Sequence, residues 1–161
     1  MNPPDLIDSA RQRAGGISQP RLGRPRQTDL QRAVSDTYYA MFHTLAGCCA
    51  NTLVGTSYVA RRRPEWRQIY RALEHGHARR QCSNHRALAQ FPPEIQRFGE
   101  HFVDTQRLRH QSDYNPESSL TRREVLRLIG ETEAIIQAFD RAPADRRRAF
   151  AIHVLFRTRT A

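Results

Sequence analysis

Hydrophobic residues recur along this chain at the three- and four-residue intervals of α-helices. The clearest helical stretch opens with a T-x-x-Q capping-box pair, Thr28 and Gln31, and continues to about residue 52. Its apolar residues form two neighbouring stripes: Val34, Tyr38, Met41, Leu45 and Cys48 in one, and Tyr39, Phe42, Ala46, Cys49 and Leu53 in the other. An apolar face of this width is typical of a helix at the centre of a bundle.

Three more long helices follow from the same pattern, over residues 64–76, 93–112 and 121–140. Shorter helices are predicted near the two ends of the chain, over residues 2–14 and after Pro143. No segment alternates polar and apolar residues for long enough to predict a β-strand. We therefore expect an all-α fold, a four-helix up-and-down bundle with short flanking helices.

A change of composition separates the first short helix from the bundle. Residues 15–27 hold three glycines, two prolines and three arginines, which is typical of a linker. We therefore expect residues 1–27 to form a short helix and a basic linker, and residues 28–161 to form the helical bundle. The linker is either a plain surface loop or a basic arm that touches RNA.

The charge of the chain points to the kind of partner. Twenty-six of its 161 residues are arginine, none is lysine, and the formal net charge is +10. Guanidinium groups bind phosphate and carboxylate through two parallel hydrogen bonds. The charge therefore favours a nucleic acid or another acidic partner, although a GC-rich genome would produce the same preference for arginine.

Other features bear on the compartment. No apolar run approaches the ~20 residues of a membrane span, and Asp5 and Asp8 interrupt the segment where a signal peptide needs an apolar core. The three cysteines include the adjacent Cys48 and Cys49, and this odd count argues against a disulfide framework. We therefore expect a cytoplasmic protein in a reducing compartment, without membrane association.

Most of the candidate chemistry lies in one stretch, RLRHQSDYNP, at the end of a predicted helix. Arg107, Arg109 and His110 are followed by Asp113 and Tyr114, so cations, an imidazole, a carboxylate and a phenol gather at one helix end. Such groups suit phosphate chemistry. The alternative interpretation is structural: Arg109 and Asp113 form an i, i+4 ion pair, and Tyr114 covers the end of the bundle.

A second arginine cluster, formed by Arg61, Arg62 and Arg63, precedes Pro64, which begins a predicted helix. A helix N-terminus is the end where positive charge is least favourable. Three arginines at this end therefore indicate a nucleic-acid-binding patch that contacts phosphate, or else a solvated loop without a binding role.

Four residues of metal-ligand types, His75, His77, Cys82 and His85, occur close together. Their spacing matches no common zinc motif, and two arginines between them would oppose a cation, so an ordinary loop with a short helical turn is the main alternative. The chain also lacks a phosphate-binding glycine loop, a G-x-S-x-G nucleophile motif and an H-E-x-x-H metal motif. No cofactor is therefore expected.

Two stretches together resemble the HEPN domain family. RAVSDTYYAMFHTLAG, residues 32–47, resembles the family's second helix, which often carries a tyrosine pair followed by alanine, an apolar residue and phenylalanine. RLRHQSDYNP, residues 107–116, resembles the segment that bears the family's arginine-and-histidine signature. The resemblance implies a four-helix up-and-down bundle that is usually a homodimer or a pseudo-dimer. Many members of the family are metal-independent endoribonucleases of toxin–antitoxin or phage-defence systems, and the resemblance implies such an activity for this chain.

The resemblance assigns roles to residues of the signature segment. Arg109 would hold the scissile phosphate, and a histidine would transfer protons as the ribose 2′-hydroxyl attacks. The family's histidine follows after four to six intervening residues, but residues 114–116 of this chain contain none. His110 is then the remaining acid–base candidate. Three neighbours would support this pair: Arg107, Asp113 and Tyr114.

The departure from the signature leaves two functions open. His110 lies one residue from Arg109, about 100° around a helix, so the two side chains converge only if the turn distorts or a dimer partner supplies one of them. The first function is RNA binding with endoribonuclease chemistry. The alternative is a non-catalytic helical interaction or dimerisation module that partners another operon product, such as a nucleotidyltransferase.

Overall fold

The computed structural model describes residues 1–15 and 25–159, and these form nine α-helices without a β-strand. The expected all-α fold is therefore confirmed. The predicted linker over residues 15–27 lies largely outside the described residues. The helices are α1 (Pro3–Arg13), α2 (Gln27–Leu53), α3 (Tyr58–Arg61), α4 (Pro64–Ala72), α5 (His75–Cys82), α6 (His85–Leu88), α7 (Pro93–Tyr114), α8 (Arg122–Arg141) and α9 (Ala144–Leu155).

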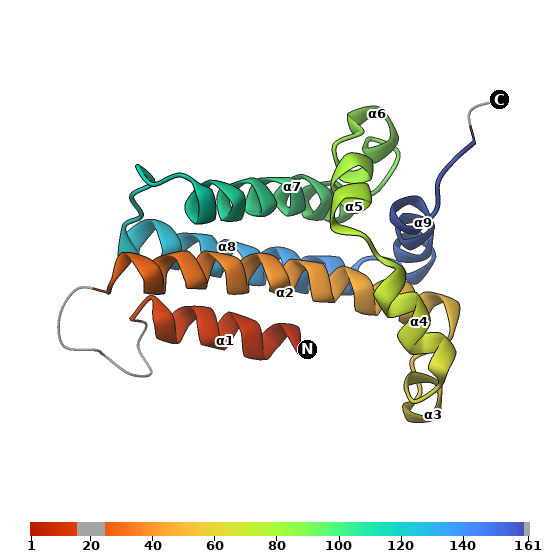
Figure 1. The fold of residues 1–161 in the computed structure, drawn as a ribbon. Coiled ribbons are helices and arrows are strands. Elements are labelled where there is room, and N and C mark those ends of the chain that lie inside the picture. Colours follow the sequence, from red (N-terminus) through yellow and green to blue (C-terminus); the bar gives the residue numbers. More distant parts are fainter. Residues whose placement is uncertain (16–24, 160–161) are drawn as a thin grey trace.

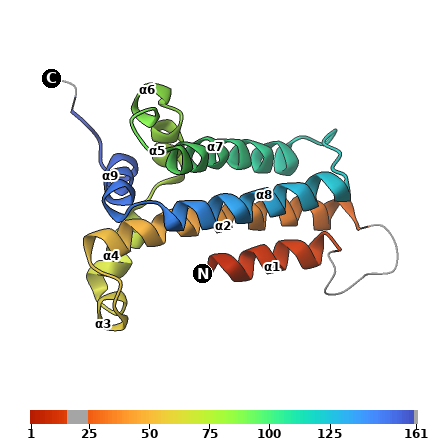
Figure 2. The same ribbon diagram turned by 180° about the vertical axis from the view of Figure 1, so that it is seen from behind.

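Four of these helices, α1, α2, α7 and α8, lie side by side (Figures 1 and 2). α2 runs through the middle and contacts the other three, and α8 also contacts α1 and α7. α2 and α8 run in one direction and α1 and α7 in the other (Figure 1). Their apolar faces enclose one core. The fully buried aromatic side chains of that core are Tyr38, Phe98, Phe102, Phe139 and Phe150.

The fourth helix of this group is α1 rather than the expected segment 64–76. Ile7 and Ala10 of α1 are buried in the common core, and the small alanine side chain lets α1 approach α2 closely. α4 instead points away from the group and buries no residue (Figure 1). It ends at Ala72 because Leu73 adopts an extended backbone, with ψ of 117°, and turns into the core.

The helix ends show where local sequence signals hold. Thr121 and Glu124 form the predicted capping box of α8, in which the Glu124 N–H donates to Thr121 Oγ1 at 3.2 Å. The capping box expected at residues 28–31 is wrong, because α2 begins one residue earlier without a side-chain cap. The Gln27 side chain instead donates to the carbonyl of Leu120 and accepts from its N–H, at 2.7 and 2.9 Å. These bonds tie the start of α2 to the segment before α8.

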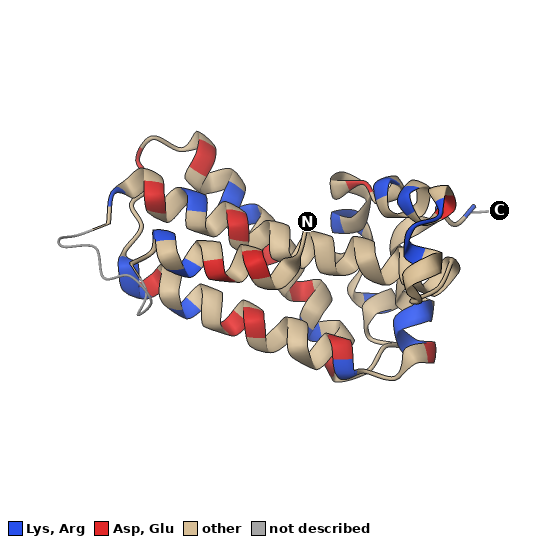
Figure 3. Cartoon of the chain, turned by 90° about the horizontal axis from the view of Figure 1, so that it is seen from below, with Lys and Arg blue, Asp and Glu red and all other residues tan. Residues whose placement is uncertain are grey.

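The segment between α2 and α7 forms one end of the molecule. α3, α4, α5 and α6 gather there, and α9 crosses the same end and contacts α2 and α5 (Figure 1). Residues 54–92 carry eight arginines and two acidic residues, whereas both kinds of charge are interspersed along the long helices (Figure 3). Within the described part of the chain, no helix has the length and apolarity needed to span a membrane.

Candidate functional site

Arg109, near the end of α7, lies against two tyrosine rings of α2. Its guanidinium carbon Cζ is 5.4 Å from the ring centroid of Tyr38 and 4.8 Å from that of Tyr39. The Arg109 side chain is 30% exposed, whereas Tyr38 is fully buried and Tyr39 is half-buried. Both contacts are cation–π interactions, which gain strength as the cation loses water. The two rings therefore fix the guanidinium from the side of α2.

Asp113 holds the same guanidinium from α7 itself. Its carboxylate oxygen Oδ2 is 3.5 Å from Arg109 Nε, so the predicted i, i+4 ion pair is present. Nε is buried and, among the described residues, has no hydrogen-bond partner. The terminal atoms Nη1 and Nη2 make no hydrogen bond within the described chain, and the side chain as a whole is 30% exposed. Two guanidinium nitrogens of an arginine that is contacted from α2 and α7 are therefore unpaired in the described chain.

His75, the first residue of α5, completes this group through Tyr38. The Tyr38 hydroxyl and His75 Nδ1 are 2.5 Å apart, and Gln106 Nε2 donates to the same hydroxyl oxygen at 3.2 Å. Gln106 supplies one hydrogen to this oxygen, which leaves the hydroxyl hydrogen available for Nδ1; in that arrangement a neutral His75 carries its own proton on Nε2. The ring of His75 also stacks on Phe42, with centroids 3.8 Å apart.

The electrostatics of this group keep both Tyr38 and His75 uncharged. Burial, followed by the nearby Arg109 guanidinium, lowers the pKa of His75 below its ordinary value. Burial also raises the pKa of the Tyr38 hydroxyl far above its ordinary value. At neutral pH the group therefore contains one cation, one carboxylate and two neutral hydrogen-bonding rings. We call it the Arg109 cluster: Tyr38, Tyr39, His75, Gln106, Arg109 and Asp113.

Three other residues of the signature segment lie outside the Arg109 cluster. His110 is exposed and its ring rests on Tyr114, with centroids 4.8 Å apart. Tyr114 is 74% exposed and therefore does not form a lid over the bundle core. Arg107 is also exposed and pairs with Asp104 at 3.1 Å. The structure thus brings His75, and not His110 of the same chain, next to Arg109.

The arginine cluster at residues 61–63 has a different environment. All three side chains are exposed. Arg62 lies over the ring of Tyr58, with its Cζ 5.2 Å from the centroid, and donates to the Tyr58 hydroxyl. Tyr58 is itself 73% exposed. These arginines form a solvated patch whose role in binding nucleic acid stays a prediction.

The four candidate metal ligands do not converge on one point; they are His75, His77, Cys82 and His85. No group of three or more His, Cys, Asp or Glu side chains suited to a metal ion occurs in the part of the chain that the structure describes. His75 belongs to the Arg109 cluster and His85 is exposed. Cys82 is a buried free thiol whose pKa burial raises to about 12. The geometry therefore gives a zinc site no support.

Three members of the Arg109 cluster have other roles in the interpretation of the sequence. Tyr38 and Tyr39 were assigned to apolar helix faces, and His75 to a metal-ligand group. The sequence carries no signal for Gln106, because a glutamine on a helix is usually a surface residue. The tyrosine pair in the resemblance to the HEPN family was the one available signal.

The Arg109 cluster combines a fixed cation, a neutral imidazole and a phenol at the edge of the core. Such a set is suited to an anionic oxygen, to which a neutral His75 with its proton on Nε2 can donate a hydrogen bond. No known protein family, curated protein or solved structure matches this chain in the comparisons made with each.

Proposed function

We propose that this chain is a HEPN-like RNA-binding protein in which Arg109 holds a phosphate of the RNA backbone. The observation that carries the proposal is the partly exposed guanidinium held against two tyrosine rings, with Nη1 and Nη2 unpaired in the described chain. In this proposal α1, α2, α7 and α8 are the four-helix up-and-down bundle that the resemblance implies.

A fixed guanidinium is better suited to phosphate than a free one. A mobile arginine side chain loses roughly 2 kcal/mol of rotamer entropy when it is immobilised, and Arg109 is already held before a ligand arrives. Its two unpaired nitrogens match two oxygens of one phosphate. Asp113 opposes the anion, but it lies beside Nε rather than beside the unpaired nitrogens. The net charge of +10 adds attraction that does not depend on sequence.

The cleavage part of the proposal requires a homodimer. The neutral His75 presents an N–H, so it can stabilise a phosphate oxygen, but attack by a ribose hydroxyl also needs a proton acceptor. His110 is an exposed imidazole that contacts no member of its own Arg109 cluster in the described chain. We therefore propose that each site combines Arg109 and His75 of one copy with His110 of the other, without a metal ion.

The test incubates the purified protein with mixed RNA in EDTA. Wild type, Arg109→Ala, His110→Ala and an equimolar mixture of the two variants are compared. We expect cleavage by wild type and a loss of about 100-fold in each variant. The mixture should recover up to about a quarter of wild-type activity, because half of the dimers are mixed and each of these holds one intact site.

The other outcomes are equally informative. If the mixture stays inactive while wild type cleaves, the two residues do not meet across a dimer. If wild type binds RNA but leaves it intact in EDTA, the cleavage part is wrong and the binding part stands. Circular dichroism of each variant establishes that the loss of activity does not follow from unfolding.

A non-catalytic interaction module is the second candidate, and Asp113 favours it. The Arg109–Asp113 pair partly neutralises the only cation of the cluster, as a purely structural contact would. The exposed His110–Tyr114 ring pair beside it then belongs to a surface for another protein. In that case Arg109→Ala lowers the melting temperature but leaves RNA affinity unchanged.

A further inference from the structure

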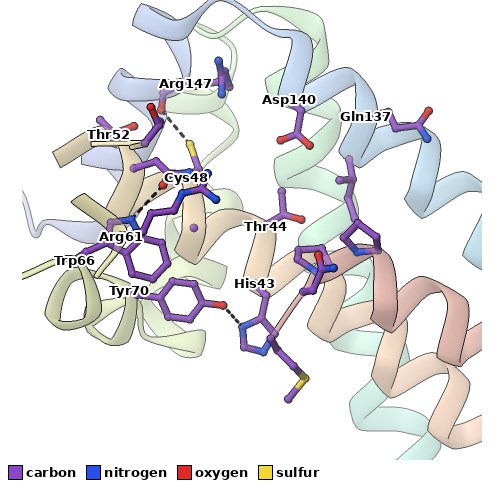
Figure 4. Close-up of a pocket in the computed structure, with 18 of the residues that line it drawn as sticks. His43, Thr44, Cys48, Thr52, Arg61, Trp66, Tyr70, Gln137, Asp140 and Arg147 are labelled. Carbon is purple, nitrogen blue, oxygen red and sulfur yellow. Dashed lines mark hydrogen bonds between the residues drawn. The ribbon is translucent and has the colours of Figure 1, made fainter. Parts of the chain in front are cut away.

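A second site lies at the arginine-rich end of the molecule. An open pocket of about 840 Å³ is lined by the start of α1, the second half of α2, α3, α4, and the junction of α8 with α9 (Figure 4). Pockets of roughly 300–1,000 Å³ are typical of small-molecule sites. No residue of the Arg109 cluster lines this pocket, so its role is independent of the proposed RNA site.

One side of the pocket is basic. Arg61, Arg147 and Arg148 line it, and they come from α3 and the first turns of α9. Arg147 uses Nε to donate to the carbonyl of Ala142 at 3.0 Å, which holds the side chain at the junction of α8 and α9. α9 starts after Pro143 without a side-chain cap, so its N-terminal dipole adds to the positive potential. This side suits a dianionic group.

An adjoining side is aromatic. The rings of Trp66 and Tyr70 stack with centroids 5.1 Å apart. Trp66 Nε1 donates to Asn51 Oδ1 at 3.1 Å, and the hydroxyl of Tyr70 shares a hydrogen bond with His43 Nδ1, as the dashed lines in Figure 4 show. These bonds fix both rings in place. The pocket therefore offers a rigid aromatic wall to a flat apolar group.

A third side of the pocket carries a carboxylate, which lies close enough to Arg147 of the basic side for their charges to interact. Asp140 of α8 extends toward Thr44 of α2, across the pocket from Trp66 and Tyr70 (Figure 4). The other acidic lining residue, Glu133, is paired with Arg11 and is therefore neutralised. Asp140 can accept hydrogen bonds from hydroxyl or amino groups of a ligand. The pocket thus has an anion-binding side, an aromatic wall and a hydrogen-bond-accepting side.

We propose that this pocket binds a small organic phosphate that carries a planar ring. The phosphate monoester would contact Arg61 and Arg148 beside the start of α9. The ring would lie along Trp66 and Tyr70, and hydroxyl or amino groups beyond the ring would reach Asp140.

The test uses Trp66, the single tryptophan of the chain, as its reporter. Phenyl phosphate, which has only the ring and the monoester, is titrated into the full-length protein while tryptophan fluorescence is recorded. We expect saturable quenching, with inorganic phosphate and phenol each binding at least about tenfold more weakly. Nucleoside monophosphates are a second arm, compared with the same nucleosides and with a dinucleotide that has only an internal phosphodiester.

Matched variants distinguish binding in this pocket from attraction by the net charge of the protein. Arg61→Ala and Arg148→Ala should each weaken phenyl phosphate binding at least about tenfold. The neighbouring Arg62→Ala and Arg146→Ala remove the same charge outside the pocket lining and should leave binding unchanged. Arg109→Ala should also bind phenyl phosphate normally, which separates failure of this proposal from failure of the RNA site. Melting curves establish that every variant is folded.

Three results would overturn the proposal. One is an absence of saturable quenching by both phenyl phosphate and the nucleoside monophosphates. Another is an equal loss of affinity in the lining variants and in their neighbours, which would mean that the net charge alone attracts the anion. The third is equal binding of the dinucleotide and the monoesters, which would make the ligand a segment of a nucleic-acid strand.

Discussion

Two arginines of the described chain lie over tyrosine rings at similar distances but in different surroundings. Arg109 lies 5.4 and 4.8 Å from the ring centroids of Tyr38 and Tyr39, and Arg62 lies 5.2 Å from that of Tyr58. Tyr38 is fully buried, whereas Tyr58 is 73% exposed. Cation–π contacts are worth about 0.5–1 kcal/mol at exposed sites and about 2 kcal/mol when water is excluded. Distance alone therefore does not identify a fixed arginine.

The difference shows how one residue type serves two purposes. Arg62 is a solvent-exposed charge whose aromatic partner, Tyr58, is four residues away in the chain and is itself exposed. Arg109 is an anchored group whose direction is set by residues of another helix and by Asp113. An anchored donor loses less entropy when it binds an anion, so it gives affinity at one position rather than over a surface. The following predictions test this contrast.

The largest expected effect is on stability. Tyr38→Ala removes a fully buried ring and should lower the free energy of unfolding by about 3–5 kcal/mol. Tyr58→Ala removes an exposed ring and should change it by less than about 0.5 kcal/mol. Urea denaturation of both variants measures the contrast. A loss of similar size in the two variants would show that the two contacts are equivalent.

Removing only the hydroxyl of Tyr38 should have a smaller effect. Tyr38→Phe keeps the ring under Arg109 but leaves His75 Nδ1 and Gln106 Nε2 without their shared partner. We expect a loss of about 1–3 kcal/mol in the free energy of unfolding. The control is Tyr39→Phe, because the Tyr39 hydroxyl has no hydrogen bond within the described chain. Equal stability of Tyr38→Phe and wild type would exclude a structural role for the hydroxyl.

The protein should also lose stability in mild acid. Burial lowers the pKa of His43, His75 and His101 in the folded state. As the pH falls below about 6.5, the unfolded chain therefore binds protons that the folded chain does not, and the free energy of unfolding decreases. Denaturation at several pH values between 7.5 and 5.5 measures the slope. His75→Gln should reduce that slope, and an unchanged slope would mean that His75 titrates normally.

Of these variants, Asp113→Asn should lower stability the least, and it should raise the affinity for RNA. The variant removes an i, i+4 ion pair worth about 0.3–0.5 kcal/mol. It also removes the anion that competes with phosphate for Arg109, so RNA affinity should rise by about threefold, or ~0.6 kcal/mol. Asp104→Asn, beside the exposed Arg107, is the matched control and should bind as wild type does. A fall in affinity for Asp113→Asn would contradict the proposed competition.

Local features of the fold could be predicted from the sequence. Helical periodicity depends on neighbours three and four residues apart, so α7 and α8 were placed within two residues of their observed ends. The capping box at Thr121 was predicted for the same reason. The position of α1 beside α2 and α8 was not predicted, because its short apolar stripe does not reveal which helices it will contact. That choice depends on packing among all the helices.

The Arg109 cluster could be predicted only in part. Arg109 and Asp113 are one helical turn apart, so their ion pair follows from spacing. Tyr38 and His75 lie far from Arg109 in the sequence, and the axial register of α2, α5 and α7 brings them together. Periodicity predicts which face of each helix is buried, but it does not predict the axial position of one helix relative to another. The imidazole next to Arg109 is therefore that of His75, which the sequence pattern had placed among the candidate metal ligands.

The most direct test of the anchored arginine is RNA affinity in Arg109→Ala compared with Arg107→Ala. Both variants remove one arginine from the last turns of α7, but Arg107 is exposed and pairs only with Asp104 in the described chain. Fluorescence anisotropy with a labelled RNA in EDTA should show a loss of about tenfold or more for Arg109→Ala and about threefold or less for Arg107→Ala. Equal losses, or no saturable RNA binding by wild type, would contradict the proposal that Arg109 is a fixed phosphate donor.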